Sequence, residues 1–335
     1  MTSLSLSERI LSWYDQNARQ LPWRTPSPHP YSVWISEIML QQTTVATVIP
    51  YFLRFMHRFP TVDMLAKASL DDVFFYWQGL GYYGRARRLL LCAQRLLETG
   101  FPKTPEEWEK LPGIGPYTAA AICSIVYDYP VLGYDGNIIR IFSRQWMRPV
   151  AKGQKKYDAS VFSSRPGDFI QGLMDLGSLI CRPQQPLCIQ CPIKDSCLAY
   201  QHQVIEQYPP PQVKKEKPIK QGHALLMQRR DGALWVCRET KQELLKGLYG
   251  VPIVMDPPTS GFRCKGHVRH SFTHFHWHVT IWHSMTDDPV QDGQWIYDLT
   301  SLPFSTLMRK ILCFTNPFDI YMRPTLNKDV RKKMT

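Results

Sequence analysis

Two acidic residues, Glu37 and Asp135, stand in sequence surroundings that favour different protonation states. Glu37 is the lone carboxylate of the apolar stretch 34–40, and burial there would raise its pKa and retain its proton. Asp135 comes just before a helical pattern, and a helix start stabilises an anion. A proton donor and a carboxylate together can hydrolyse a glycosidic bond. Each residue alone could also be a solvent-facing glutamate or an ordinary helix-capping aspartate.

Four of the nine cysteines form a cluster with the spacing C-x6-C-x2-C-x5-C, namely Cys181, Cys188, Cys191 and Cys197. In a reducing compartment, thiolates this close in sequence favour metal ligation over disulfides. Four thiolates satisfy a tetrahedral zinc site, and they equally satisfy an iron–sulfur cluster. Spacing alone leaves both groups open.

The segment 111–119, LPGIGPYTA, lies between a short helical pattern and an alanine-rich one. Gly113 and Gly115 would let the turn adopt positive φ angles and present backbone N–H groups at a helix N-terminus. Such a turn can hold a DNA phosphate without reading sequence. The alternative is a tight helix–turn–helix that binds nothing.

The chain is basic, with a formal net charge of +12 and a pI near 9.3. The excess is shared equally by residues 1–217 and 218–335, so a polyanionic partner suits both parts. A content of 44% hydrophobic and 12% aromatic residues argues against wholesale disorder. No apolar run approaches the roughly 20 residues that span a bilayer, and the N-terminus lacks a signal-peptide core. We therefore expect a cytoplasmic protein without a membrane partner.

Helical signals dominate residues 1–200. Capping-box patterns at 5–8 and 104–107 predict helix starts, and the helical apolar spacing over 31–55 is interrupted only by Pro50. Residues 201–217 are proline-rich and then charged, as in a linker. Strand patterns at 233–237 and 275–282 predict a separate domain over 218–318, and 319–335 form a basic tail. The predicted fold class is α + (α+β).

Further motifs occur in a fixed order along the chain, and together they resemble the adenine-specific MutY glycosylases of the helix–hairpin–helix endonuclease III superfamily. The motifs are LPWR at 21–24, the Glu37 segment ending QQT at 41–43, GLGYY at 79–83, the hairpin, DGN at 135–137 and LMDLG at 173–177. The similarity covers nearly all of residues 5–200. It implies an all-helical glycosylase domain and one structural [4Fe–4S] cluster per chain, held by the four cysteines of the 181–197 loop.

The resemblance assigns catalytic roles to four residues. It implies that Glu37 protonates the adenine, that Asp135 stabilises or transiently captures the sugar cation, and that Asn137 supports the site. Bifunctional members of the superfamily carry a lysine where this chain has Tyr117, and that amine starts strand cleavage. Because tyrosine cannot form a Schiff base, we expect base release that leaves the backbone intact.

Contacts with the flipped base and the duplex follow from the same resemblance. The residues concerned are Arg19, Trp23 and Gln171 for the base pocket, Gln42 and Tyr82 for the wedge that opens the duplex, Gly113 and Gly115 for the hairpin, and Arg24 and Leu40 for further contacts.

Residues 218–318 resemble, more weakly, the Nudix-like α/β C-terminal domain of this family, which reads the 8-oxoguanine opposite the adenine. Phe272, Thr273 and His274 match the reading loop, with threonine in place of the commoner serine. The segment 247–252 has lost the tryptophan and phenylalanine of its family motif. The carboxylate-rich Nudix box is absent, which argues against pyrophosphate hydrolysis.

These observations predict a monofunctional, monomeric DNA glycosylase of base excision repair. Its partner would be double-stranded DNA with adenine opposite 8-oxoguanine or guanine, and it would be cytoplasmic, bacterial in type and associated with the nucleoid. One alternative is an endonuclease III-like glycosylase/lyase for oxidised pyrimidines, against which Tyr117 and the second domain argue. A catalytically silent lesion-binding protein is the other, and only turnover would exclude it.

Overall fold

The computed structural model describes residues 4–150, 165–210, 216–239, 244–289 and 292–315. The predicted basic tail 319–335 lies outside the described residues, as do residues 211–215 of the predicted linker. The described chain forms two compact units. Unit 1 comprises Met1–Ala66 and Leu91–Val213, and unit 2 comprises Lys67–Leu90 and the described residues of Lys214–Thr335.

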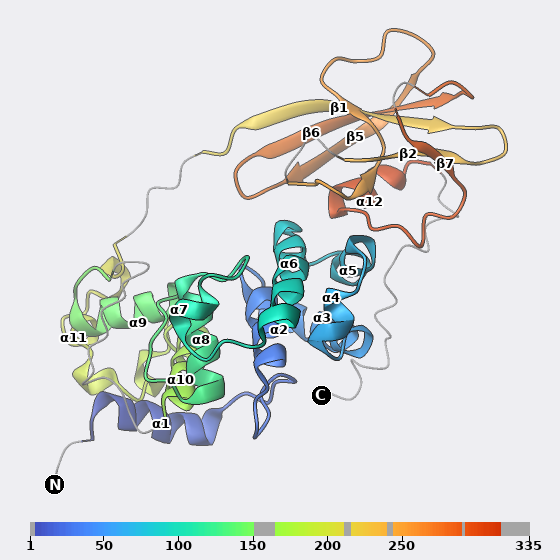
Figure 1. The fold of residues 1–335 in the computed structure, drawn as a ribbon. Helices are drawn as coiled ribbons and strands as arrows, with labels where there is room; N and C mark the ends of the chain where they lie inside the picture. The colour runs from blue at the N-terminus through green and yellow to red at the C-terminus, as the bar shows by residue number, and fades with distance from the viewer. Residues whose placement is uncertain (1–3, 151–164, 211–215, 240–243, 290–291, 316–335) are drawn as a thin grey trace. The chain divides into compact units, whose positions relative to one another are not determined.

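Unit 1 is helical, as predicted for this half of the chain (Figure 1). Its α-helices are α1 (Leu6–Asn17), α2 (Pro30–Leu40), α3 (Val45–Arg58), α4 (Val62–Ala66), the second half of α6 (Gly84–Thr99), α7 (Pro105–Trp108), α8 (Pro116–Tyr127), α9 (Gly136–Trp146), α10 (Pro166–Leu179) and α11 (Leu198–Gln201). Both predicted capping boxes are present, at Ser5 before α1 and at Thr104 before α7. No helix among the described residues is long and apolar enough to cross a membrane.

The helical pattern over 31–55 breaks at a different place from the one predicted. Pro50 lies inside α3, and the chain turns instead at 41–44, between α2 and α3. Gln42 adopts a φ of 58° and Thr44 takes an extended conformation as the residue before α3. Pro50 is the sixth residue of α3, past the first turn, so its missing N–H removes one backbone hydrogen bond of this helix.

The core of unit 1 is built around α10, which packs against α1, α8 and α9. Ile10, Phe142, Phe169 and Leu173 are buried in one apolar cluster between these helices. Gly177 of α10 lies directly against Asn137 of α9, where an added Cβ would stand 2.6 Å from the Asn137 Cβ. This close approach brings the start of α9 against α10, and the candidate site is built there.

Unit 2 contains a mixed sheet whose main strand order is β3-β2-β1-β6-β5 (Figure 1). The strands are β1 (Ile219–Gln228), β2 (Leu234–Arg238), β3 (Tyr249–Gly250), β4 (Ile253–Val254), β5 (Arg263–Ser271), β6 (His276–Met285) and β7 (Gln294–Ile296). β1 and β6 pair in parallel, from Ile219 opposite His276 to Gln228 opposite Met285. β5 pairs antiparallel to β6, so the loop 272–275 joins two neighbouring strands at one end of the sheet. Helix α12 (Thr306–Leu312) contacts β5, and the sheet confirms the two predicted strands.

Residues 67–90, assigned from sequence to the helical domain, pack with the sheet of unit 2. They include α5 (Leu70–Trp77) and the first half of α6. Arg238 of β2 forms a 2.5 Å ion pair with Asp71, and Arg87 donates a hydrogen bond to the Lys246 carbonyl. An added Cβ on Gly247 would lie 3.2 Å from the Phe74 ring. These polar and apolar contacts explain why the segment groups with the sheet.

Candidate active site

A cleft of about 1050 Å³ opens in unit 1 and brings together residues from distant parts of the sequence. Three of the four predicted catalytic residues, Glu37, Tyr117 and Asp135, carry acidic or phenolic groups, and all three line this cleft. Other predicted site residues that line it are Arg19, Leu40, Gln42, Gly115 and Asn137. The cleft thus collects eight of the predicted residues, although they extend along the chain from Arg19 to Asn137.

Glu37 lies on α2 and is only 5% exposed to solvent. Removal from water disfavours the charged carboxylate and, with help from the nearby Asp135 charge, raises the pKa of Glu37 to about 7. A hydrogen bond from Tyr117 and the charge of Arg24 act in the opposite direction. The side chain can therefore carry a proton at neutral pH, as its apolar sequence neighbours predicted.

Asp135 is the N-cap of α9, as predicted. Its Oδ1 accepts a 2.7 Å hydrogen bond from the Ile138 backbone N–H, and its Oδ2 accepts one of 3.0 Å from Asn137 Nδ2. Burial nevertheless raises the pKa of Asp135 above its ordinary value, and these hydrogen bonds only oppose the shift. The expectation that the helix start alone would stabilise the anion was incomplete, because desolvation is the larger effect here.

Tyr117 lies in the first turn of α8, and its hydroxyl donates a 3.8 Å hydrogen bond to Met174 Sδ and also interacts with the Glu37 carboxyl, whose pKa it lowers. Burial and the neighbouring carboxylates raise the pKa of Tyr117 well above its usual value, so the phenol stays protonated. A Cβ added to Gly133 would lie 2.8 Å from the Tyr117 carbonyl oxygen. Glycine at position 133 therefore allows the segment before Asp135 to approach α8 closely.

A smaller cavity adjoins Glu37 and holds the predicted base-pocket residues. Trp23, Arg24, Gln171, Arg19 and Leu40 line it together with Glu37. The ring of Trp23 is 7% exposed and meets Phe52 edge-on at 5.3 Å between centroids. The cavity has a volume of about 40 Å³ and combines apolar residues with the polar side chains of Arg19, Arg24 and Gln171.

Sequence reasoning missed Arg140, which donates a hydrogen bond to Asn137, the residue that in turn donates to Asp135. Its Nη2 donates 2.8 Å hydrogen bonds to Asn137 Oδ1 and to the Gly177 carbonyl, and its Nε donates one of 2.7 Å to the Cys181 carbonyl. Asn137 in turn contacts Asp135. The spacing of Arg140, one turn after Asn137 in the predicted helix, could have indicated a contact between these two residues. Its contacts with the Gly177 and Cys181 carbonyls could not be read from the sequence.

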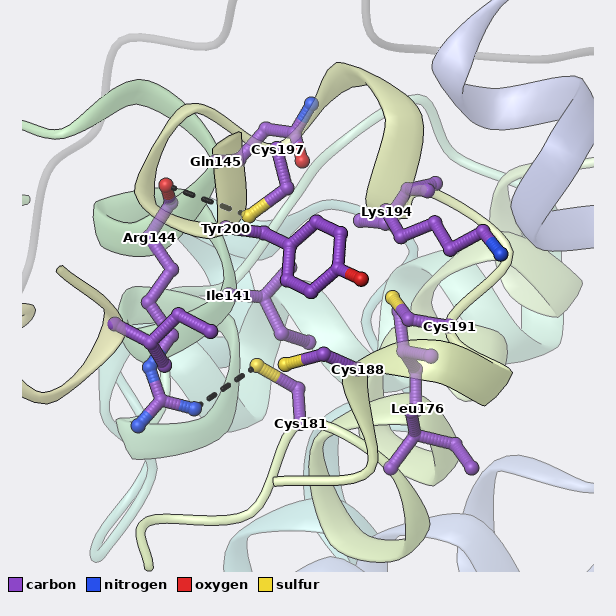
Figure 2. Close-up of a pocket in the computed structure, with 13 residues that line it drawn as sticks. Ile141, Arg144, Gln145, Leu176, Cys181, Cys188, Cys191, Lys194, Cys197 and Tyr200 are labelled. Atoms are coloured by element: carbon purple, nitrogen blue, oxygen red, sulfur yellow. Dashed lines mark hydrogen bonds between the residues drawn. The ribbon is translucent and has the colours of Figure 1, made fainter. Parts of the chain in front are cut away.

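The four clustered cysteines line one cavity in unit 1 with apolar walls that include Ile141, Leu176 and Ile193 (Figure 2). All four thiols are free. Arg144 Nη1 points at Cys181 Sγ at 3.4 Å, as a donor that would stabilise a metal-bound thiolate does. Among the described residues, no three His, Cys, Asp or Glu side chains are close enough to hold a metal ion as they stand.

The hairpin before α8 differs in detail from the prediction of two positive φ angles. Gly113 has a φ of 82°, whereas Gly115 has a φ of −99° and serves as the N-cap of α8. No heavy atom lies within 4 Å of a Cβ added to Gly115, so the N-cap of α8 has open space beside it. The first residue of α8 is Pro116, which has no N–H, and Thr118 is buried, so phosphate binding at this helix N-terminus stays a prediction.

The two predicted wedge residues share an unusual backbone conformation. Gln42 and Tyr82 have φ angles of 58° and 50°, in the left-handed region that side chains other than glycine rarely adopt. Both are exposed, and Tyr82 is 37% exposed despite its large ring. Strained backbone of this kind collects at functional sites.

Tyr82 also meets the loop between β5 and β6 within unit 2. Its hydroxyl lies 2.8 Å from Thr273 Oγ1. Tyr82, Phe272 and Thr273 line a cavity of about 390 Å³, together with Lys217. His274, the third residue of the predicted reading loop, is exposed and is not among the residues lining that cavity.

The chain is similar in sequence to known DNA repair proteins. Residues 35–160 match the family model of the HhH-GPD superfamily base excision DNA repair protein. The adenine DNA glycosylase of Mus musculus is 43% identical over 213 residues, which cover 57% of this chain and 41% of that protein. The adenine DNA glycosylase of Buchnera aphidicola subsp. Acyrthosiphon pisum is 38% identical over 266 residues, which cover 75% of each protein.

Among solved structures, a thermostable thymine-DNA glycosylase shares the fold of the helical part. It superposes with a TM-score of 0.51 at 24% identity, over 58% of this chain and 95% of that one. The chain spans less than half the length of the mouse and rat relatives it matches. Because it is similar to the Buchnera protein and matches the HhH-GPD family model, the chain belongs to the adenine DNA glycosylase family of the HhH-GPD superfamily.

Proposed function

We propose that this chain is a monofunctional DNA glycosylase that hydrolyses the N-glycosidic bond of adenine mispaired with 8-oxoguanine or guanine. The observation that carries the proposal is the buried pair in the cleft. Glu37 has a pKa raised to about 7 by burial, and Asp135 caps α9 in the same cleft. The named relatives, which are adenine DNA glycosylases, supply the substrate.

In the proposed reaction the flipped adenine enters the smaller cavity beside Trp23 and Gln171. Glu37 transfers its proton to a ring nitrogen of the purine as the bond from C1′ to the base breaks, and the bonding electrons leave with the base. The sugar becomes an oxocarbenium ion, which the Asp135 carboxylate stabilises or captures. Water then adds to C1′, and its proton passes to the Glu37 carboxylate.

Tyr117 orients this chemistry without forming a covalent bond to the sugar. Its hydroxyl interacts with the Glu37 carboxyl, and burial raises the pKa of Tyr117 well above its usual value, so no phenolate is available as a nucleophile. The chain has no amine at this position to form a Schiff base, so the proposed product is an abasic site in an intact strand. This feature favours the glycosylase over the endonuclease III-like glycosylase/lyase.

The four cysteines would hold a [4Fe–4S] cluster. The donor set fits, because four thiols surround one apolar cavity and Arg144 directs an N–H at Cys181 Sγ. When bound, the cluster would cross-link the four cysteines of the 181–197 loop and would take no part in bond cleavage. Zinc is the other group that four thiolates could hold.

The C-terminal sheet would read the base opposite the adenine. Supporting this, Thr273 and Phe272 border a cavity shared with the wedge residue Tyr82. A Nudix-like identity for residues 218–318 is proposed on the mixed sheet with its parallel β1–β6 pair. His274 would contact the duplex from its exposed position. The proposed protein acts as a monomer associated with DNA in the nucleoid of a bacterium.

The experiment that tests this function uses a duplex with one 8-oxoguanine:adenine pair. We expect strand scission at the adenine only after alkali, because the enzyme leaves an abasic site. Nicking before alkali, or release of thymine glycol from a second duplex, would instead identify a glycosylase/lyase. Binding without any base release would identify a silent lesion-binding protein.

A further inference from the structure

Asp175 of α10 is completely buried and binds two arginines. Arg19 places Nε and Nη2 at 2.8 and 2.5 Å from Asp175 Oδ1, and Arg24 places Nη1 at 2.7 Å from Oδ2 and Nη2 at 2.9 Å from Oδ1. The Arg19 backbone N–H adds a further bond of 3.1 Å to Oδ2. One carboxylate thus receives five hydrogen bonds and offsets only one of two positive charges.

The two arginines of this Arg–Asp–Arg triad form part of the wall of the cavity beside Glu37. Arg19, Arg24 and Glu37 all line that cavity, and Arg19 also lines the larger cleft. A purely structural tie between α10 and the loop after α1 would require a single arginine. The second arginine leaves a surplus positive charge at the place where Glu37 must hold its proton.

We propose that Asp175 is a positioning residue of the excision reaction, which fixes Arg19 and Arg24 in the cavity wall and, by offsetting one of their charges, governs proton donation by Glu37. The proposal rests on the proposed function. It assigns to Asp175 a role in tuning the acid, in addition to holding the loop in place.

The charges facing Glu37 make the direction of the effect definite. Tyr117 from α8, Asp135 from the start of α9 and Arg24 from the loop after α1 are the groups that act on it. Asp135 raises the pKa of Glu37, whereas Tyr117 and Arg24 lower it. While Asp175 pairs with Arg24, the field of the guanidinium at Glu37 is weakened by the opposite charge beside it.

The test compares the pH dependence of single-turnover excision for Asp175→Asn and Arg24→Met with that of wild type. Asp175→Asn leaves both arginines uncompensated, so the alkaline limb should move to lower pH by about one unit. Arg24→Met leaves Arg19 paired with Asp175 and removes the surplus charge, so the limb should move to higher pH. General damage to the fold would not shift the two limbs in opposite directions.

Asp168→Asn is the matched control, because Asp168 lies on the same helix but pairs with the exposed Arg165. It should leave the limb unchanged. If Asp175→Asn does not fold, Asp175→Glu serves as the conservative variant, and its alkaline limb should lie at the wild-type pH. Arg24→Met then still tests the expected shift of the alkaline limb to higher pH.

A second readout separates this proposal from the proposed function. Titration of the Glu37 carboxyl by ¹³C NMR in selectively labelled protein needs no catalysis, and its midpoint should move in the same opposite directions. Unchanged midpoints, or shifts of the same sign in both variants, overturn the role of Asp175 even if adenine is released. Absence of adenine release with opposite NMR shifts overturns the function and leaves the charge relation standing.

Discussion

The close approach of α10 to α9 makes Gly177→Ala a demanding perturbation of the active site. The added methyl group would lie 2.6 Å from Asn137 Cβ and 3.1 Å from Asn137 Cγ. Asn137 is held on both sides, since its Nδ2 donates to Asp135 Oδ2 at 3.0 Å and its Oδ1 accepts from Arg140 at 2.8 Å. Moving Asn137 therefore moves the support of the catalytic carboxylate.

The size of the effect follows from these distances. An ordinary carbon contact begins near 3.4 Å, so α9 or α10 must shift by roughly 0.8 Å to relieve the 2.6 Å approach. Overpacking of this kind costs about 1–3 kcal/mol, and the better helix propensity of alanine returns about 1 kcal/mol. A displacement near 1 Å at a catalytic group costs on the order of 100-fold in rate. We expect a small loss of stability and a large loss of rate.

Single-turnover excision and thermal unfolding, measured on the same preparations, check this prediction. Gly172→Ala on the same helix is the control, because its methyl group would be similarly crowded, with Ile10 Cγ2 at 3.1 Å and Tyr14 Cβ at 3.3 Å, but against α1 and away from Asn137. The control should retain a rate within about threefold of wild type, as expected for a substitution that does not disturb catalytic geometry. A Gly177→Ala protein with the wild-type rate would refute the role assigned to the α9–α10 contact.

Three further perturbations test other parts of the site. Wild-type excision should slow as the pH rises through about 7, where Glu37 loses its proton. Tyr117→Phe should move this alkaline limb of the pH–rate profile to higher pH, because the interaction with the Tyr117 hydroxyl that lowers the pKa of Glu37 is gone. An alkaline limb that stays in place or moves to lower pH would contradict this. Cys188→Ser should abolish visible absorbance and iron content measured on the purified protein, whereas Cys264→Ser, outside the cluster, should keep both; equal iron in the two variants would remove Cys188 from the ligand set. Thr273→Val should reduce the preference for 8-oxoguanine over guanine in duplex binding, while Thr273→Ser should preserve it. If the ratio of the two dissociation constants is unchanged in the valine variant, the Thr273 hydroxyl does not recognise the 8-oxoguanine.

Local signals in the sequence predicted several elements that position the site. Serine and threonine caps with glutamate three residues later marked the starts of α1 and α7, and Asp135 marked the start of α9. The apolar neighbours of Glu37 predicted its burial. Such features depend on residues within one or two turns of each other, which sequence patterns describe well.

Contacts between distant residues could not be predicted in the same way. Asp175 lies more than 150 positions from both of its arginines, and the LMDLG motif indicated nothing about that pairing. The turn at Gln42 was missed because its positive φ carries no glycine to announce it. The packing of Lys67–Leu90 with the sheet likewise depends on tertiary contacts, such as that between Asp71 and Arg238.

The central claim is that Glu37 and Asp135 act as a pair on the adenine nucleotide. The most direct measurement is the amount of free adenine released in a single turnover by wild type, Glu37→Gln and Asp135→Asn, each saturated with an 8-oxoguanine:adenine duplex. Because general acid catalysis alone contributes about 10²–10⁴-fold, each variant should bind the duplex within a few-fold of wild type yet release adenine at least about 100 times more slowly. A variant that binds normally and releases adenine within tenfold of the wild-type rate would contradict the account.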